Sequence, residues 1–165
     1  MAESFSFDVV SVFDRQELVN ALDQVKREIS QRYDLKGTDT SVNLDKENIF
    51  IVTNSELSVN AVNDIIRQKA LKRNLSLKIF DYGETEIVSG NKVRQKILLR
   101  QGIKQEIAKK ISKKIRDQIK KINFSINGET LRVSSKSKND LQLAIKLVSE
   151  LEESLNIPLK ANNFR

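Results

Sequence analysis

The stretch "TSVNLDKENIFIVT" at residues 40–53 holds two short runs rich in apolar and β-branched residues, joined by the polar turn "DKEN". Such runs on both sides of a polar turn are typical of paired strands, so this stretch predicts a β-hairpin. The stretch "INFSINGETLRVSS" at residues 122–135 has the same organisation, with Asn127-Gly128 at its turn. Asn-Gly is a strong signal for a two-residue hairpin loop. The chain therefore carries two similar hairpins, one in each half.

The segments around the two hairpins also correspond. Val42 matches Phe124, and Ile51 matches Val133, at one constant offset. In each half the pattern predicts a strand, a helix, the hairpin, a second helix and a final strand. The expected elements of the first half are a strand at 4–13, a helix at 15–31, strands at 40–44 and 48–53, a helix at 57–72 and a strand at 76–82. Those of the second half are a strand at 93–99, a helix at 103–122, strands at 122–126 and 130–135, a helix at 138–155 and a strand at 157–164.

Two βαββαβ units are the natural interpretation of this order. Each unit would form a four-stranded antiparallel sheet with two helices on one face, which is the ferredoxin-like fold of the α+β class. We expect a first, acidic repeat at residues 1–90 and a second, strongly basic repeat at 91–165, with the glycine-containing segment 81–90 as their junction.

The composition excludes several kinds of chemistry. The chain has no His and no Cys, so the usual zinc and haem sites and the Ser-His and Cys-His nucleophile systems are ruled out. Neither GxGxxG nor GxxxxGK[ST] occurs. We therefore expect no catalytic residues, no metal, no cofactor and no enzymatic activity. The chain also lacks an apolar run long enough to span a bilayer and a signal-peptide pattern. A cytoplasmic protein without a membrane partner is expected.

Charge is distributed unevenly along the chain. Residues 1–90 hold 11 Lys and Arg against 15 Asp and Glu, whereas residues 91–165 hold 18 against seven. Such an asymmetry indicates an anionic partner for the second half. A general solubility effect in a lysine-rich chain is the alternative.

The expected helix at 103–122 concentrates this charge. Its isoleucines recur at every fourth position and form an apolar stripe that would cover a sheet. Four cations form a ridge opposite the stripe, namely Lys109, Lys113, Arg116 and Lys120. We interpret this ridge as a binding site for nucleotide or nucleic-acid phosphates. A solvated helix face with Glu106–Lys110 and Asp117–Lys121 pairs and a membrane-surface helix are the alternatives.

Further residues could extend the site. Arg100 and Gly102 precede the helix, where free backbone N–H groups favour an anion. Arg132, Lys136 and Lys138 lie along the passage from a strand to the last helix. A second basic cluster, Arg67, Lys69, Lys72 and Arg73, lies at a helix end in the first half, where cations have a structural role with the helix dipole.

Four stretches together resemble the bacterial YajQ family of nucleotide-binding proteins. They are "SFDVVSVFDRQELVNALDQVKREISQRYDLKG", "RQGIKQEIAKKISKKIRDQIKK", "LRVSSKSKNDLQ" and "NNFR". The resemblance extends from Ser6 to Arg165. It implies a duplicated ferredoxin-like fold and allows the N-terminal strands, at about 5–12 and 93–100, to be exchanged between domains. Periodicity leaves this point open, because a short link from strand to helix permits either packing. The resemblance also implies binding of nucleotides and RNA, with cyclic di-GMP as a ligand of some members.

Three functions follow from these observations. The first is a non-enzymatic protein that binds nucleotide or RNA through the basic second half. The second is a sensor of a small nucleotide, for example cyclic di-GMP, that signals to a protein partner. The third is an adaptor with no nucleotide ligand. The sequence leaves the oligomeric state open, with a monomer slightly favoured.

Overall fold

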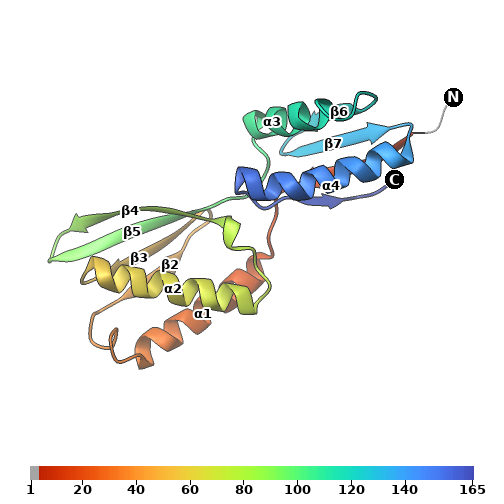
Figure 1. The fold of residues 1–165 in the computed structure, drawn as a ribbon. Coiled ribbons are helices and arrows are strands. Elements are labelled where there is room, and N and C mark those ends of the chain that lie inside the picture. Colours follow the sequence, from red (N-terminus) through yellow and green to blue (C-terminus); the bar gives the residue numbers. More distant parts are fainter. Residues whose placement is uncertain (1–3) are drawn as a thin grey trace. The chain divides into compact units, whose positions relative to one another are not determined.

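A computed structural model describes residues 4–165 (Figure 1). The chain contains eight strands, four α-helices and one 3₁₀ turn within this range. In chain order they are β1 (Phe5–Val10), α1 (Arg15–Gln31), β2 (Ser41–Leu44), β3 (Asn48–Thr53), α2 (Glu56–Lys72), η1 (Leu77–Ile79), β4 (Phe80–Val88), β5 (Lys92–Leu99), α3 (Gln105–Arg116), β6 (Asn123–Asn127), β7 (Thr130–Ser135), α4 (Lys138–Leu155) and β8 (Lys160–Asn162).

The predicted fold class is confirmed. The strands form two four-stranded antiparallel sheets, one ordered β2-β3-β5-β4 and the other β6-β7-β1-β8. Each sheet is covered on one face by two helices, α1 and α2 in one case and α3 and α4 in the other (Figure 1). This arrangement is that of two ferredoxin-like units.

Each sheet contains one strand from the other half of the sequence. β1 lies between β7 and β8, with Phe7 opposite Val133 and Val9 opposite Leu131. β5 lies between β3 and β4, with Ile49 opposite Ile97. The compact units are therefore residues 13–100, which we name the central unit, and residues 1–12 with 101–165, which we name the terminal unit.

Strand exchange redistributes the charge. The terminal unit holds 14 Lys and Arg against nine Asp and Glu, and the central unit holds 15 against 13. Their net charges are thus +5 and +2, a smaller contrast than the one between the halves of the sequence. The difference arises because β5 and Arg100 bring four cations into the central unit. Within the terminal unit, residues 104–138 alone hold 11 cations against three acids. The basic character belongs to this segment rather than to the whole unit.

Each unit has its own core. In the central unit, the predicted stripe of α1 is buried, with Leu18, Val25 and Ile29 facing the sheet. In the terminal unit, Ile111 and Ile115 of α3 pack in the same core as residues of β1 and β7. Side-chain caps fix three helix starts, because Asp14, Ser55 and Ser137 accept hydrogen bonds from backbone N–H groups of the first turns. No helix within residues 4–165 is long and apolar enough to cross a membrane.

The helix expected at 103–122 is shorter than its pattern suggests. α3 ends at Arg116, and residues 117–122 form a turn that leads into β6. Ile119 and Ile122 remain buried although they lie outside the helix. The turn is held by the Ser135 hydroxyl at the end of β7, which donates to the Lys121 carbonyl at 3.0 Å.

Two turns also differ from the prediction. Asn127 pairs with Thr130, so the hairpin loop is Gly128-Glu129 rather than Asn127-Gly128. Of the two loop residues, Gly128 has a positive φ, of 61°, and Glu129 does not. This is the pattern of a type II′ turn with glycine at its first central position. The segment 81–90 is not a junction, because β4 continues to Val88 and pairs with β5. Its ladder is shifted by a bulge between Tyr82 and Thr85.

Candidate functional site

The cations of α3 line a hollow beside the edge strand β6. Lys109, Lys113 and Arg116 lie on one exposed face of the helix because they are four and three residues apart. Phe124 and Ile126 of β6 are opposite the buried Val133 and Leu131, so they share the helix-covered side of the sheet. We name this space the α3–β6 hollow. Its volume is about 420 Å³, and it is lined by Lys109, Ser112, Lys113, Arg116, Asp117, Phe124 and Ile126.

A cation–π contact closes one side of the α3–β6 hollow. The guanidinium carbon of Arg116 lies 4.9 Å from the ring centroid of Phe124. Phe124 is half-buried and packs against the core of the terminal unit, whereas Arg116 is exposed. A fixed ring therefore supports a solvent-facing cation.

A second hollow lies where the chain passes from β7 into α4. It has a volume of about 520 Å³, and we name it the β7–α4 hollow; it is lined by Lys120, Lys121, Ile122, Asn123, Ser135, Lys136 and Ser137. The Ser135 hydroxyl donates to the Lys121 carbonyl at 3.0 Å and accepts from the Ser137 N–H at 3.1 Å. These bonds fix the 117–122 turn against the start of α4. Lys120 was predicted on the ridge of α3, but the early end of the helix brings it here instead.

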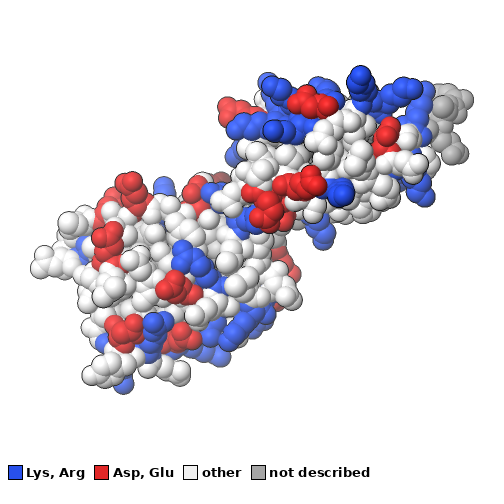
Figure 2. All heavy atoms as spheres, in the orientation of Figure 1, with Lys and Arg blue, Asp and Glu red and all other residues white. Residues whose placement is uncertain are grey.

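Seven cations around these hollows have no ionic partner among the described residues, and we name them the cation surface: Lys109, Lys113, Arg116, Lys120, Lys121, Lys136 and Lys138. Within residues 4–165, none of the seven lies within 4.0 Å of a carboxylate oxygen. Figure 2 shows Lys and Arg gathered over the part of the terminal unit that holds α3. Unpaired like charges on one face repel one another, and a bound polyanion would relieve that repulsion.

The intrahelical pairs expected for a solvated face do not form. Neither Glu106 with Lys110 nor Asp117 with Lys121 makes an ion pair in the described part of the chain. The reason is clear for the second pair, because the helix ends at Arg116 and the four-residue spacing no longer places the two side chains together.

Arg132, a predicted site residue, is engaged elsewhere. Its Nε donates to Asp8 Oδ1 at 3.1 Å across the β1–β7 ladder. Burial alone would raise the pKa of the Asp8 carboxyl, but hydrogen bonds from Asn163 and Arg132 and the charge of Arg132 hold that pKa below its usual value. Asp8 therefore remains ionised at neutral pH and neutralises Arg132.

Arg100 and Gly102, also predicted, have structural contacts. The Arg100 guanidinium donates to the Lys78 carbonyl at 3.1 Å and forms an ion pair with Asp81 in the central unit. The Gly102 N–H donates to the Ser11 carbonyl at 2.7 Å. The Glu129 carboxylate occupies the space beside Gly102, where a Cβ would meet its Oε2 at 2.1 Å. These contacts account for both residues without a ligand.

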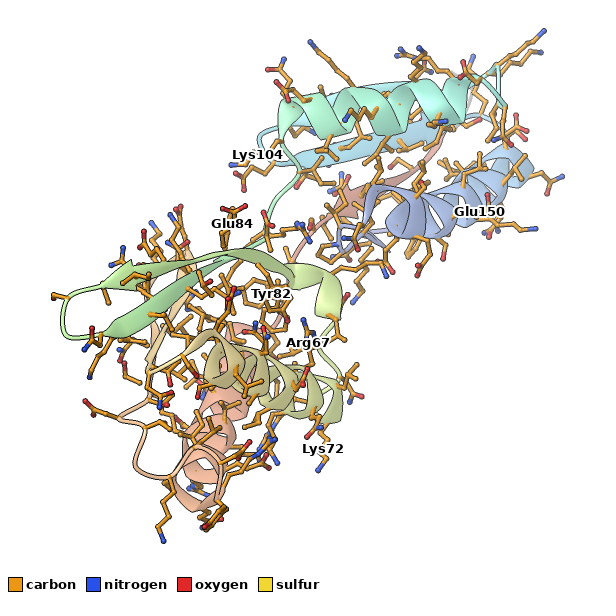
Figure 3. The ribbon with its side chains drawn as sticks, turned by 60° about the vertical axis from the view of Figure 1, so that its left-hand side comes forward. Arg67, Lys72, Tyr82, Glu84, Lys104 and Glu150 are labelled. Carbon is orange, nitrogen blue, oxygen red and sulfur yellow. The ribbon has the colours of Figure 1, made fainter. Side chains whose placement is uncertain are left out.

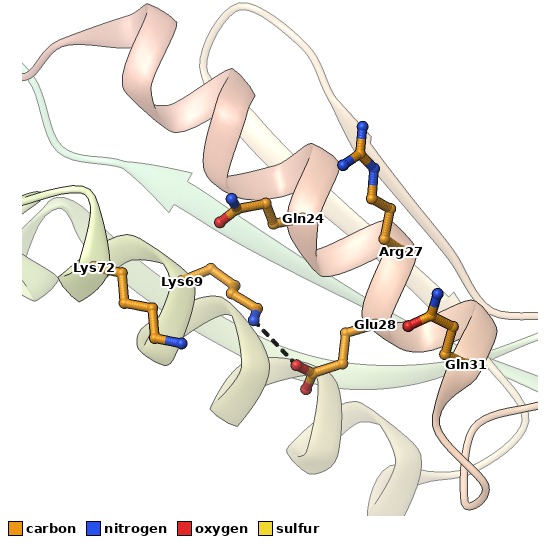
Figure 4. Close-up of a pocket in the computed structure, with 6 residues that line it drawn as sticks. All are labelled: Gln24, Arg27, Glu28, Gln31, Lys69 and Lys72. Carbon is orange, nitrogen blue, oxygen red and sulfur yellow. Dashed lines mark ion pairs between the residues drawn. The ribbon is translucent and has the colours of Figure 1, made fainter.

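The basic cluster at the end of α2 in the central unit is mostly ion-paired. Arg67, Lys69 and Arg73 form ion pairs with Asp64, Glu28 and Glu17 respectively. The hollow between α1 and α2 in Figure 4, lined by Gln24, Arg27, Glu28, Gln31, Lys69 and Lys72, contains the Glu28–Lys69 pair at 3.1 Å. Figure 3 shows Arg67 of α2 beside Tyr82 of β4, with 4.7 Å between its guanidinium carbon and the ring centroid. The structural interpretation of this cluster is supported for three of its four cations.

Comparison with known proteins identifies the family of the chain. A model of the family described as "Nucleotide-binding protein YajQ-like" matches residues 5–165. The chain belongs to the YajQ-like family. A protein named "Nucleotide-binding protein" from Prochlorococcus marinus strain AS9601 is 90% identical over 165 residues, which cover the whole of both chains. Relatives of the same description from Prochlorococcus marinus strain MED4 and strain MIT 9211 are 76% and 56% identical, again over the whole of both chains.

Sequence reasoning missed several residues of the hollows in this YajQ-like chain, among them one cation and two apolar side chains. Lys121 belongs to the β7–α4 hollow, and Phe124 and Ile126 belong to the α3–β6 hollow. A signal for Phe124 and Ile126 existed, since they alternate on an edge-strand segment that directly follows the cationic helix. Strand alternation identifies their face, but it does not show that part of the face is left open at the side of α3.

Proposed function

We propose that this YajQ-like chain is a non-enzymatic protein that binds a nucleotide or a nucleic acid through the cation surface of the terminal unit. The gathering of seven unpaired cations around two hollows, within residues 4–165, is the observation that carries the proposal; Arg67, Lys69 and Arg73 of the central unit are ion-paired instead. Membership of a family described as nucleotide-binding supports the class of ligand. The absence of His and Cys from the sequence supports binding without catalysis.

Phosphate contact would be the main source of affinity. Lysine and arginine on an exposed face bind phosphate oxygens and release counterions, without reading base sequence. The α3–β6 hollow and the β7–α4 hollow are connected by the turn at 117–122, so a short strand could contact cations of both.

Salt dependence tests this proposal. We expect a fluorescent single-stranded RNA of about 12 nucleotides to bind the chain with a slope of log K against log salt of about −2 to −4. This range corresponds to three to six phosphate contacts at roughly 0.7 each. Fluorescence anisotropy between about 50 and 200 mM salt measures the slope. No binding at the lowest salt, or a slope near zero, would contradict phosphate contact as the source of affinity.

A small-nucleotide sensor is the second candidate. The volumes of the two hollows, about 420 and 520 Å³, lie in the range typical of small-molecule sites. Calorimetric titration with mononucleotides and cyclic dinucleotides, beside the short RNA, separates the two. A free nucleotide that binds as tightly as the RNA favours the sensor, whereas binding of neither favours an adaptor role.

A further inference from the structure

We propose that Arg116, held over the ring of Phe124, is a stacking platform for one unpaired nucleobase. This inference rests on the proposed function and goes further, because phosphate contacts alone do not distinguish a base-bearing strand from a bare backbone. It assigns the α3–β6 hollow to the base and the neighbouring lysines to its phosphates.

The platform consists of two side chains that differ in burial. Phe124 is half-buried, belongs to a strand and packs against the core, so its ring is fixed. Arg116 is exposed in the last turn of α3, and its guanidinium carbon lies 4.9 Å from the Phe124 ring centroid. The ring contacts the guanidinium from the sheet, and the Arg116 side chain is otherwise exposed to solvent and accessible to a base. Bases of single-stranded nucleic acids stack on guanidinium planes and on aromatic side chains.

The charge of Arg116 is not neutralised by any residue that the structure describes. A contact of the same kind, at a different place in the fold, occurs in the central unit, where Arg67 of α2 lies over Tyr82 of β4 at 4.7 Å, but Arg67 also donates to Asp64 at 2.9 Å. Arg116 has no carboxylate within 4.0 Å in the described part of the chain. The arginine of this arrangement is therefore ion-paired in the central unit, whereas in the terminal unit it is free to contact a ligand.

The rest of the hollow suits a nucleotide. Ile126 is 42% exposed and offers an apolar wall beside the platform. Lys113 and Lys109 lie about 5 and 10 Å from Arg116 along the helix axis, within reach of the phosphates that flank a stacked base. Paired bases inside a duplex present no free face to such a platform, so single strands are the expected ligand.

The substitution Arg116→Lys tests the platform because it keeps the charge and removes the plane. The probes are a single-stranded DNA of about eight nucleotides and an abasic strand with the same number of phosphates. We expect the substitution to weaken binding of the base-bearing strand about tenfold, in the range measured for loss of one stacked base, and to change binding of the abasic strand less than about twofold. Phe124→Leu should act in the same direction through loss of the supporting ring, with thermal melting as a check on folding.

The control is Arg67→Lys, which alters the arginine-over-aromatic contact of the central unit and should affect neither probe. Equal weakening of both strands by Arg116→Lys, or no effect on either, would overturn the platform while leaving phosphate binding in place. Failure of the wild-type chain to bind either strand would instead contradict the proposed function itself, and the platform with it.

Discussion

Phe7→Ala should destabilise the terminal unit by about 3–5 kcal/mol and leave the central unit nearly unchanged, although Phe7 lies at the start of the chain. The Phe7 ring is 0% exposed and packs with Ile111 and Ile115 of α3. Its strand is hydrogen-bonded on both sides, to β7 and to β8. The lost ring leaves a cavity in that core only, and the cost is a large share of the stability of a small domain.

Ile97→Ala is the mirror control. Ile97 is also 0% exposed, but it lies on β5 in the core of the central unit, where its truncation should cost about 2–5 kcal/mol. Hydrogen–deuterium exchange measures both effects by segment. Phe7→Ala should lower protection in residues 105–155, and Ile97→Ala in residues 15–88. Loss of protection in 15–88 from Phe7→Ala would show that β1 belongs to the other sheet.

Joint replacement of Lys109, Lys113 and Arg116 by Gln should weaken binding of the 12-nucleotide RNA by on the order of 100-fold at low salt. The estimate takes about 1 kcal/mol for the loss of each exposed cation beside the strand. The salt slope should also become shallower by about two, because three cations near the phosphates are lost. The three side chains are exposed and have no ionic partner in the described structure, so the fold should tolerate the change.

The control for this triple variant lies in the central unit. Lys26, Arg27 and Lys36 are exposed, and none has an ionic partner within residues 4–165. Their replacement by Gln removes the same net charge from the chain. Affinity and salt slope should then stay close to those of the wild type. Equal losses from the two triple variants would mean that the RNA responds to overall charge and not to the cation surface.

Much of the fold was predictable because its signals are local. The helices at 15–31 and 138–155 and the strands at 48–53 and 130–135 begin and end as the sequence indicates. Asp14 and Ser137 mark helix starts by accepting from the first-turn N–H groups. Alternation alone identifies the buried faces of the strands in the second hairpin.

The remaining features depend on contacts between distant residues. The place of β1 between β7 and β8 cannot be read from periodicity, since the strand pattern of residues 5–10 fits either sheet. α3 ends at Arg116 although the isoleucine pattern continues to Ile122, and the turn that follows is bonded to Ser135 of β7.

The candidate site was also predicted only in part. The composition shows that residues 104–138 are rich in cations, but it does not show which of these cations lack an ionic partner. Arg132 is neutralised by Asp8, a residue 124 positions away in sequence. Lys120 and Lys136 line one hollow because the Ser135 hydroxyl bonds the turn carbonyl of Lys121. Pairing partners decide whether a surface lysine can meet a ligand, and those partners come from the fold.

The most direct test of the cation surface is a map of the residues that respond to ligand. Backbone amide shifts of the ¹⁵N-labelled chain would be followed by NMR during titration with the 12-nucleotide RNA. The proposed function predicts shifts concentrated at residues 109–126 and 135–138 of the terminal unit, around the two hollows. Shifts confined to residues 13–100 would contradict it.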